Sequence, residues 1–285
     1  MHGRRGFCGA GAQAVVAHWG PHFGEEPPIS GSRGSGNVFF SPCNLRCVFC
    51  QNHQISHLLA GHEVSVAGLA GIFAALERAG AHNINLVSPT PYVPLIAAAI
   101  RAARKTGVSV PFVYNTNAYE TTETIRLLEG LIDVYLPDFK YWTPGVARRL
   151  SGAPDYAEHA AVAIMAMKAQ VGDLARDDEG LAKRGLIVRH LVLPGALAGT
   201  RKVMRWVKEH LGAQTYVSLM SQYYPVHEAK HYPLIDRTLK PGEYERLVSF
   251  MIDEGFENVF IQELDSAPAL LPDFTREQPF EKHRA

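Results

Sequence analysis

The chain has 285 residues, of which 47% are hydrophobic and 20% are charged, so its composition is that of a globular protein and excludes a disordered or low-complexity chain. Lys and Arg together number 28, as do Asp and Glu, and this balance provides no overall field that would attract nucleic acid or an anionic membrane. The longest apolar stretch, Ala67 to Leu76, is far shorter than the roughly 18 residues of a transmembrane helix, so we expect neither nucleic acid nor a membrane as a partner.

The first 36 residues differ in composition from the rest. Arg4 and Arg5 are followed by no continuous apolar region before Gly20, so the sequence does not predict a secretory signal. Residues 20–36, GPHFGEEPPISGSRGSG, are rich in Pro and Gly and predict an extended segment that wraps the core. The GSRGSG within it precedes a predicted strand, whereas the dinucleotide-binding fingerprint follows a strand and opens a helix, so we do not assign it to phosphate binding.

From Val38 onward, short apolar runs alternate with segments of helical periodicity. Apolar residues in the helical segments recur at i, i+3, i+4 and i+7, as in the segment that starts at Leu69, and each such stripe should face a sheet. The run at 258–262 is a possible seventh strand. Six runs predict buried parallel strands: 37–40, 84–87, 110–115, 134–139, 186–193 and 215–220.

A strict alternation of strand and helix predicts an α/β fold with a parallel sheet and right-handed crossovers. Six units are too few for a full eight-stranded barrel and could close only part of the way. The pattern by itself leaves a partial barrel and a doubly wound open sheet as alternatives. Both place the active site at the carboxyl ends of the strands, so functional residues are expected in the segments that follow them.

Three of the four cysteines lie within eight residues, directly after the first predicted strand. Cys43, Cys47 and Cys50 have the spacing C-x3-C-x2-C, and Cys8 lies far upstream. Three thiolates can each hold one corner of a cubane iron–sulfur cluster and leave the fourth iron open to a substrate or cofactor. We expect a cytoplasmic protein, and because thiols stay reduced in that compartment, clustered cysteines favour metal binding over disulfides.

Two other interpretations of the cysteines compete with the open cluster. A zinc site of three Cys and one His could recruit His53, although structural zinc usually joins two separated ligand pairs and this stretch has one. Core thiols are disfavoured by the crowding of three cysteines into one loop. A further alternative is an iron–sulfur electron carrier or sensor.

The stretch resembles the signature of the radical S-adenosylmethionine (SAM) superfamily, C-x3-C-x-aromatic-C, with Phe49 before the last cysteine. The wider stretch GEEPPISGSRGSGNVFFSPCNLRCVFCQN resembles an uncharacterised branch related to pyruvate formate-lyase activating enzyme, and the resemblance covers residues 24–263. It implies a partial (β/α)6 TIM-like barrel with an extended N-terminal segment. We therefore divide the chain into an N-terminal segment (1–36), a barrel (37–265) and a C-terminal tail (266–285).

The resemblance also implies the cofactors and the chemistry. In the family, SAM chelates the open iron of a [4Fe-4S] cluster. An electron from the reduced cluster cleaves SAM to methionine and a 5'-deoxyadenosyl radical, and this radical abstracts a hydrogen atom from the substrate. A backbone glycine of a partner enzyme is one substrate that the relatives suggest. Such an oxidoreductase needs an electron donor, such as flavodoxin or ferredoxin.

Family positions transfer to this chain residue by residue. Phe49 matches the aromatic residue near the adenine. Where the family usually has Gly-Gly-Glu for the SAM amino group, this chain has Ser88-Pro89-Thr90, which supplies no carboxylate. The resemblance then implies a contact from the Ser88 or Thr90 hydroxyl, from a backbone carbonyl of this segment or from elsewhere. The alternative role for Phe49 is core packing, which is compatible with a position near the adenine.

Four further positions follow from the resemblance. In PDFK, Asp138 and Lys140 match the Asp-x-Lys of the activating enzymes, with an exposed ion pair as the alternative. Arg189, inside the apolar run VRHLVLPG, matches an arginine that binds the SAM carboxylate, and a buried unpaired arginine would be costly. His227 in YYPVHEAKH matches a contact to the ribose or adenine. Asn115, at a strand end, is a candidate for the pocket or for a turn.

Overall fold

One mostly parallel sheet organises the part of the chain that the structure describes. The computed structural model describes residues 6–264 and 271–280. The sheet runs in the order β10, β9, β8, β6, β5, β4, β2, β1, β3, and β7 pairs with β8 outside this path. The strands are β1 (Ala14–His22), β2 (Ser35–Phe40), β3 (His62–Val64), β4 (Ile84–Val87), β5 (Phe112–Thr116), β6 (Val134–Pro137), β7 (Ala175–Arg176), β8 (Ala182–Leu191), β9 (Tyr216–Met220) and β10 (Val259–Ile261).

The predicted strands are confirmed, with their ends moved by a few residues. The six runs correspond to β2, β4, β5, β6, β8 and β9, and the possible seventh is β10. Along the sheet path, neighbouring strands from β2 to β10 pair in parallel. β2, β4 and β6 are buried along their whole length, which explains why their sequences do not alternate between apolar and exposed polar residues. Their polar residues, such as Asn37 and Asn85, are themselves buried.

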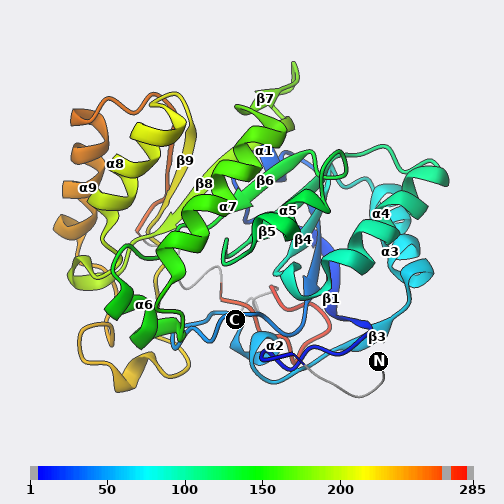
Figure 1. Ribbon diagram of the computed structural model, residues 1–285, viewed down its shortest axis with the longest axis horizontal. Helices are drawn as coiled ribbons and strands as arrows, with labels where there is room; N and C mark the ends of the chain where they lie inside the picture. The colour runs from blue at the N-terminus through cyan, green and yellow to red at the C-terminus, as the bar shows by residue number, and fades with distance from the viewer. Residues whose placement is uncertain (1–5, 265–270, 281–285) are drawn as a thin grey trace, which may run out of the picture.

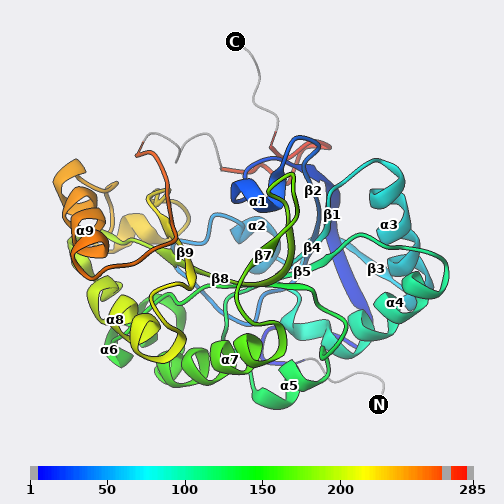
Figure 2. The same cartoon turned by 90° about the horizontal axis from the view of Figure 1, so that it is seen from above.

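The long helices lie on the outer face of the sheet. In Figure 2 they form an arc around the strands, and the side opposite α7 is open. A doubly wound sheet would carry helices on both faces, so the arrangement is a partial barrel, as expected. The helices of this arc are α3 (Val66–Arg78), α4 (Val93–Lys105), α5 (Thr122–Arg126), α7 (Tyr156–Val171), α8 (Thr200–Leu211) and α9 (Pro241–Asp253), and α6 (Pro144–Ser151) precedes α7.

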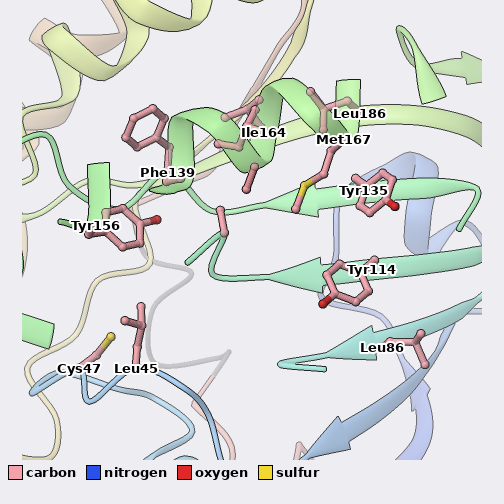
Figure 3. Packing of buried hydrophobic residues seen from close by; sticks show 14 of the residues in the cluster. Leu45, Cys47, Leu86, Tyr114, Tyr135, Phe139, Tyr156, Ile164, Met167 and Leu186 are labelled. Atoms are coloured by element: carbon pink, nitrogen blue, oxygen red, sulfur yellow. The ribbon is translucent and has the colours of Figure 1, made fainter. Parts of the chain in front are cut away.

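The main hydrophobic core fills the space between the outer face of the sheet and these helices. In Figure 3, Ile164 and Met167 of α7 point toward Tyr135 of β6 and Leu186 of β8, and all four side chains are buried. Burial of a side chain of this size contributes about 1.5–3 kcal/mol relative to exposure. This layer holds the strands rigidly, and the segments that follow their carboxyl ends are thereby fixed in place.

The inner face of the sheet changes from apolar to polar along the strands. Ile29 of α1 (Pro27–Ser30) belongs to a cluster with inward-facing apolar residues of three strands and fills the base of the barrel. Because side chains alternate between faces, the residue two positions further along each strand points to the same interior. These pairs are Val113 and Asn115 in β5, Leu136 and Asp138 at the end of β6, and Ile187 and Arg189 in β8.

The N-terminal segment, predicted as an extended segment that wraps the core, contains regular secondary structure. β1 adds an antiparallel strand between β2 and β3, and residues 27–30 form a short helix under the barrel. In Figure 1 the C-terminal segment, drawn in red, lies beside α2 (His53–Ser56), where Gln54 Oε1 accepts from the Phe274 N–H at 2.7 Å. The division at residues 36 and 265 stays a prediction. Within the described residues, no helix combines the length and the apolar character needed to cross a membrane.

Candidate active site

The carboxyl ends of the parallel strands surround one cavity, here called the central cavity. It encloses about 1170 Å³, part of which is open to solvent. Cys43, Cys47 and Cys50 all line it. The other predicted residues that line it are Phe49, Ser88, Asn115, Asp138, Lys140 and Arg189, whereas Pro89, Thr90 and His227 do not.

Backbone hydrogen bonds hold the loop that carries the three cysteines. The Val48 N–H donates to the Leu150 carbonyl at 2.9 Å, and the Val48 carbonyl accepts from the Glu228 N–H at 2.9 Å. At the start of the loop, the Cys43 N–H donates to the Ser56 carbonyl at 3.3 Å. The loop is therefore anchored to α6, to the segment after β9 and to α2, so the three thiols have defined positions.

Two of the three thiols, those of Cys43 and Cys50, lie in a buried environment that disfavours their ionisation. Burial and the nearby Cys47 raise the pKa of Cys43, and the same two causes raise the pKa of Cys50 to about 12. Thiols in such a setting are protonated at neutral pH, and a metal group that binds them must displace those protons. Cys8 is free and does not line the cavity.

The donor set fits a cluster better than a single metal ion. Among residues 6–264 and 271–280, no three His, Cys, Asp or Glu side chains are grouped so that they could hold one ion. His53, the candidate fourth zinc ligand, stacks on the His227 ring with centroids 4.9 Å apart, and its Nδ1 lies 3.2 Å from the Cys50 carbonyl. In a cubane each thiolate binds a different iron, so three thiols that line one cavity need not meet at a point.

Asp138 and Lys140 form an ion pair at the end of β6, with both side chains 18% exposed. The Asp138 N–H donates to the Thr116 carbonyl at 2.8 Å, and the Lys140 N–H donates to Tyr156 Oη at 2.9 Å. Burial lowers the pKa of Lys140, but Asp138 and the nearby thiol of Cys47 raise it, and the net shift is upward. Lys140 is therefore a fixed cation beside the cysteines.

Arg189 is bound on two sides by carboxylates that the sequence did not single out. Its Nε donates to Glu26 Oε1 at 2.9 Å and its Nη2 donates to Glu25 Oε2 at 3.0 Å. Glu25 Oε1 accepts from the Asn37 and Asn85 side-chain amides, each at 2.9 Å. Burial of Arg189 therefore does not by itself indicate a ligand, because its partners come from the chain itself. Its contact with the SAM carboxylate stays a prediction.

Ser88 and Thr90, which stand where the family has Gly-Gly-Glu, point to different places. Ser88 lines the cavity with a φ of +56°, and its N–H donates to the Asn115 carbonyl at 3.0 Å. Thr90 Oγ1 donates instead to Glu120 Oε1 at 3.1 Å, outside the cavity lining. Burial raises the pKa of Glu120, although hydrogen bonds from Thr116 and others oppose the shift.

The two aromatic candidates also differ. Phe49 lines the cavity, is 5% exposed, and meets Tyr223 edge to face with centroids 5.5 Å apart. Its side chain can therefore pack in the core and contact a ligand in the cavity at the same time. His227 lies beside His53 and His57, and its contact to the ribose or adenine stays a prediction.

The wall of the cavity at β2 comes from both ends of the described chain. His22 at the end of β1 lines it, and its ring centroid is 4.3 Å from that of Phe280. Phe280 also contacts Phe39 of β2, with centroids 5.5 Å apart. Sequence reasoning assigned no role to these residues or to the Glu25–Glu26 pair, although Glu25, Glu26 and Phe39 lie in the stretch that carries the resemblance to the activating-enzyme branch.

Comparison with known proteins bears on both the site and the fold. Residues 37–175 match the family model described as Radical SAM superfamily. The uncharacterized protein MJ0674 of Methanocaldococcus jannaschii is 32% identical over 252 residues, which cover 85% of this chain and 68% of that protein.

The solved structures are similar in fold alone. HydG, a maturase of the [FeFe]-hydrogenase, has a TM-score of 0.55 at 14% identity, covering 83% of this chain and 54% of that one. SuiB of Streptococcus suis has a TM-score of 0.52 at 14% identity, covering 80% of this chain and 49% of that one. The chain thus spans about half the length of these solved structures.

Proposed function

This chain belongs to the radical SAM superfamily, and we propose that it cleaves SAM reductively and uses the resulting radical to take a hydrogen atom from a substrate. Proteins of this superfamily bind a [4Fe-4S] cluster and SAM. When both are bound, the reduced cluster would supply one electron to the sulfonium of SAM. A C–S bond of SAM would then break, yielding methionine and a 5'-deoxyadenosyl radical. The observation that carries the proposal is that Cys43, Cys47 and Cys50 line one cavity together with Asp138, Lys140 and Arg189.

The residues of the cavity have separable roles in this proposal. The three thiolates would hold the cluster at the cavity that they line. Lys140, kept protonated by Asp138, and Arg189, kept cationic by Glu25 and Glu26, line the same cavity as the cysteines and would attract the carboxylate of SAM. Ser88 and Asn115 offer neutral hydrogen-bonding groups, and Phe49 offers an apolar surface for the adenine.

Reconstitution under anaerobic conditions tests the proposal. The protein loaded with iron and sulfide should be brown and should convert SAM to 5'-deoxyadenosine when dithionite is supplied. The triple variant Cys43→Ala, Cys47→Ala, Cys50→Ala should bind no cluster and form no product, whereas Cys8→Ala should behave as the unaltered protein. Product formation by the triple variant would refute the proposal, and a brown protein that binds no SAM by calorimetry would instead be an electron carrier.

A finer proposal concerns the partner proteins. The resemblance to activating enzymes suggests that the radical acts on a backbone glycine of a partner enzyme and that flavodoxin or ferredoxin supplies the electron in the cytoplasm. Incubation of the loaded protein with SAM and a candidate partner should then produce a glycyl radical, detected by electron paramagnetic resonance. If SAM is cleaved but no candidate acquires a radical, the substrate belongs to another class.

A further inference from the structure

Each of the three cysteine thiols has its own polar side-chain partner, and each partner comes from a different element. The partners lie in α6, in the segment after β5 and in α2, and all three are less than 9% exposed. The contacts are Ser151 Oγ to Cys47 Sγ at 3.0 Å, Asn117 Nδ2 to Cys43 Sγ at 3.3 Å, and Ser56 Oγ to Cys50 Sγ at 3.2 Å.

The contact to Cys47 belongs to a buried group of hydroxyls. Tyr141 Oη lies 2.7 Å from Ser151 Oγ, and the tyrosine is fully buried. Tyr141 also forms a side-chain hydrogen bond with Cys47, so both hydroxyls lie beside this sulfur. The Ser151 hydroxyl donates to Cys47 Sγ at 3.0 Å.

The other two contacts also have a defined donor. Asn117 Oδ1 accepts from the Tyr119 N–H at 2.9 Å, which fixes the orientation of the amide and turns its nitrogen toward Cys43. A thiolate at Cys50 carries no proton, so Ser56 must be the donor once the cysteine binds metal. All three sulfurs thus receive one side-chain hydrogen bond in the state that holds a cluster.

We propose that Ser151, Asn117 and Ser56 are positioning residues that set the reduction potential of the cluster bound by the three cysteines, an inference that rests on the proposed function. Reduction by one electron, delivered by a low-potential donor, adds negative charge to the cluster and its sulfurs. A hydrogen bond to a sulfur stabilises the reduced form more than the oxidised form, so each donor raises the potential. Ser151 has a larger effect than Ser56, because its hydroxyl lies nearer to the sulfur, at 3.0 Å against 3.2 Å.

Redox titration of the reconstituted protein tests the assignment, with the reduced cluster followed by electron paramagnetic resonance. Ser151→Ala should make the midpoint potential more negative, corresponding to a change of about tenfold in the reduction equilibrium, or ~59 mV for one electron. Ser56→Ala should shift it in the same direction by less. Ser151→Thr keeps the hydroxyl and should restore the original potential.

A matched control separates hydrogen bonding to sulfur from general destabilisation. Ser35 is also buried and donates to Asn83 Oδ1 at 2.6 Å, but it begins β2 at the opposite end from the cysteine loop. Ser35→Ala should leave the potential unchanged. Iron and sulfide analysis of every variant shows that a full cluster is being titrated.

The outcomes distinguish this inference from the proposed function. An unchanged or raised potential in both Ser151→Ala and Ser56→Ala, with full iron content, overturns the inference and leaves the proposed function standing. If Ser151→Ala does not fold, Ser56→Ala decides alone, because Ser56 lies in a different element. An unaltered protein that binds no [4Fe-4S] cluster overturns the proposed function and this inference with it.

Discussion

Five charged side chains stand close together on the inner wall of the barrel, and each cation among them has a carboxylate partner. Lys140 pairs with Asp138, and Arg189 pairs with Glu25 and Glu26. Buried ion pairs add little net stability, because desolvation offsets attraction, but removal of one partner leaves an uncompensated buried charge and is costly. We infer that these pairs keep two cations in fixed positions at the cavity.

Glu25→Gln tests the pair with Arg189 through its pH dependence. Burial alone would raise the pKa of Glu25, but Arg189 and its other partners lower it below the ordinary value. The ionised form therefore stabilises the folded state above the ordinary carboxyl pKa, and this contribution is lost as the pH falls through the lowered value. At neutral pH the variant should lose about 3 kcal/mol of unfolding free energy, near the lower end for a broken buried pair because Glu26 remains.

Urea unfolding from neutral pH to about pH 3 measures this difference. The deficit of Glu25→Gln should shrink on acidification, because protonation removes the same charge from the unaltered protein. Glu63→Gln, at an exposed position of β3, should be neutral throughout. A deficit that stayed constant with pH would show that the cost comes from the amide and not from the lost charge.

At the scale of elements, residues at the carboxyl ends of the strands line the cavity. Where another backbone segment passes close to a strand, it limits the size of the side chains that fit there. β8 carries both Ile187 at the base and Arg189 at the cavity, and it passes close to the residues that follow α7. Gly185 in β8 has a φ of +128°, and a Cβ there would lie 2.4 Å from the Asp173 carbonyl oxygen and from Leu174 Cα. Only glycine fits this crossing without movement of the backbone.

Gly185→Ala should therefore lower the free energy of unfolding by about 2–6 kcal/mol, the sum of backbone strain and overpacking. Gly180→Ala is the matched control, because Gly180 also has a positive φ, +80°, but a Cβ there meets nothing within 4 Å. It should cost about 1–2 kcal/mol from strain alone. Equal losses in the two variants by urea unfolding would contradict the crossing as the cause.

At the scale of the whole molecule, the sheet is a partial barrel whose two edges, β10 and β3, do not pair with each other in the described chain. The open side carries α1 and the C-terminal segment, as Figure 2 shows. Phe274 and Phe280 of that segment pack on Phe39, with ring centroids 5.3 and 5.5 Å away. The segment thus covers the cavity wall that β2 provides.

Removal of residues 271–285 should leave the barrel folded but less stable. The main core does not include the segment, so circular dichroism should keep its helical and strand content. Loss of two half-buried aromatic side chains should lower the unfolding free energy by about 2–4 kcal/mol. The single variant Phe274→Ala should show part of this loss, and exposed Phe7→Ala should show none. If the truncated chain lost its cooperative unfolding transition, the segment would belong to the core.

The sequence by itself determined the α/β fold class, the positions of the parallel strands along the chain and the loop that carries three cysteines. Mainly apolar runs such as 84–87 and 134–137 favour strands of a sheet that is buried on both faces, and β4 and β6 match them. The spacing of Cys43, Cys47 and Cys50 is local, so it predicts that the three thiols lie in one loop whatever the rest of the chain does.

Only the tertiary structure decided which residues from distant segments complete the cavity. Glu25 meets Arg189 although 164 positions separate them, and Ser151 meets Cys47 across 104 positions. Contacts of this kind leave no periodicity or spacing in the sequence, because they depend on how helices and loops pack after the strands have paired. Thr90 shows the same limit: its place in the family motif made its hydroxyl one of several candidates for the SAM contact, and only the structure shows that it donates to the buried Glu120.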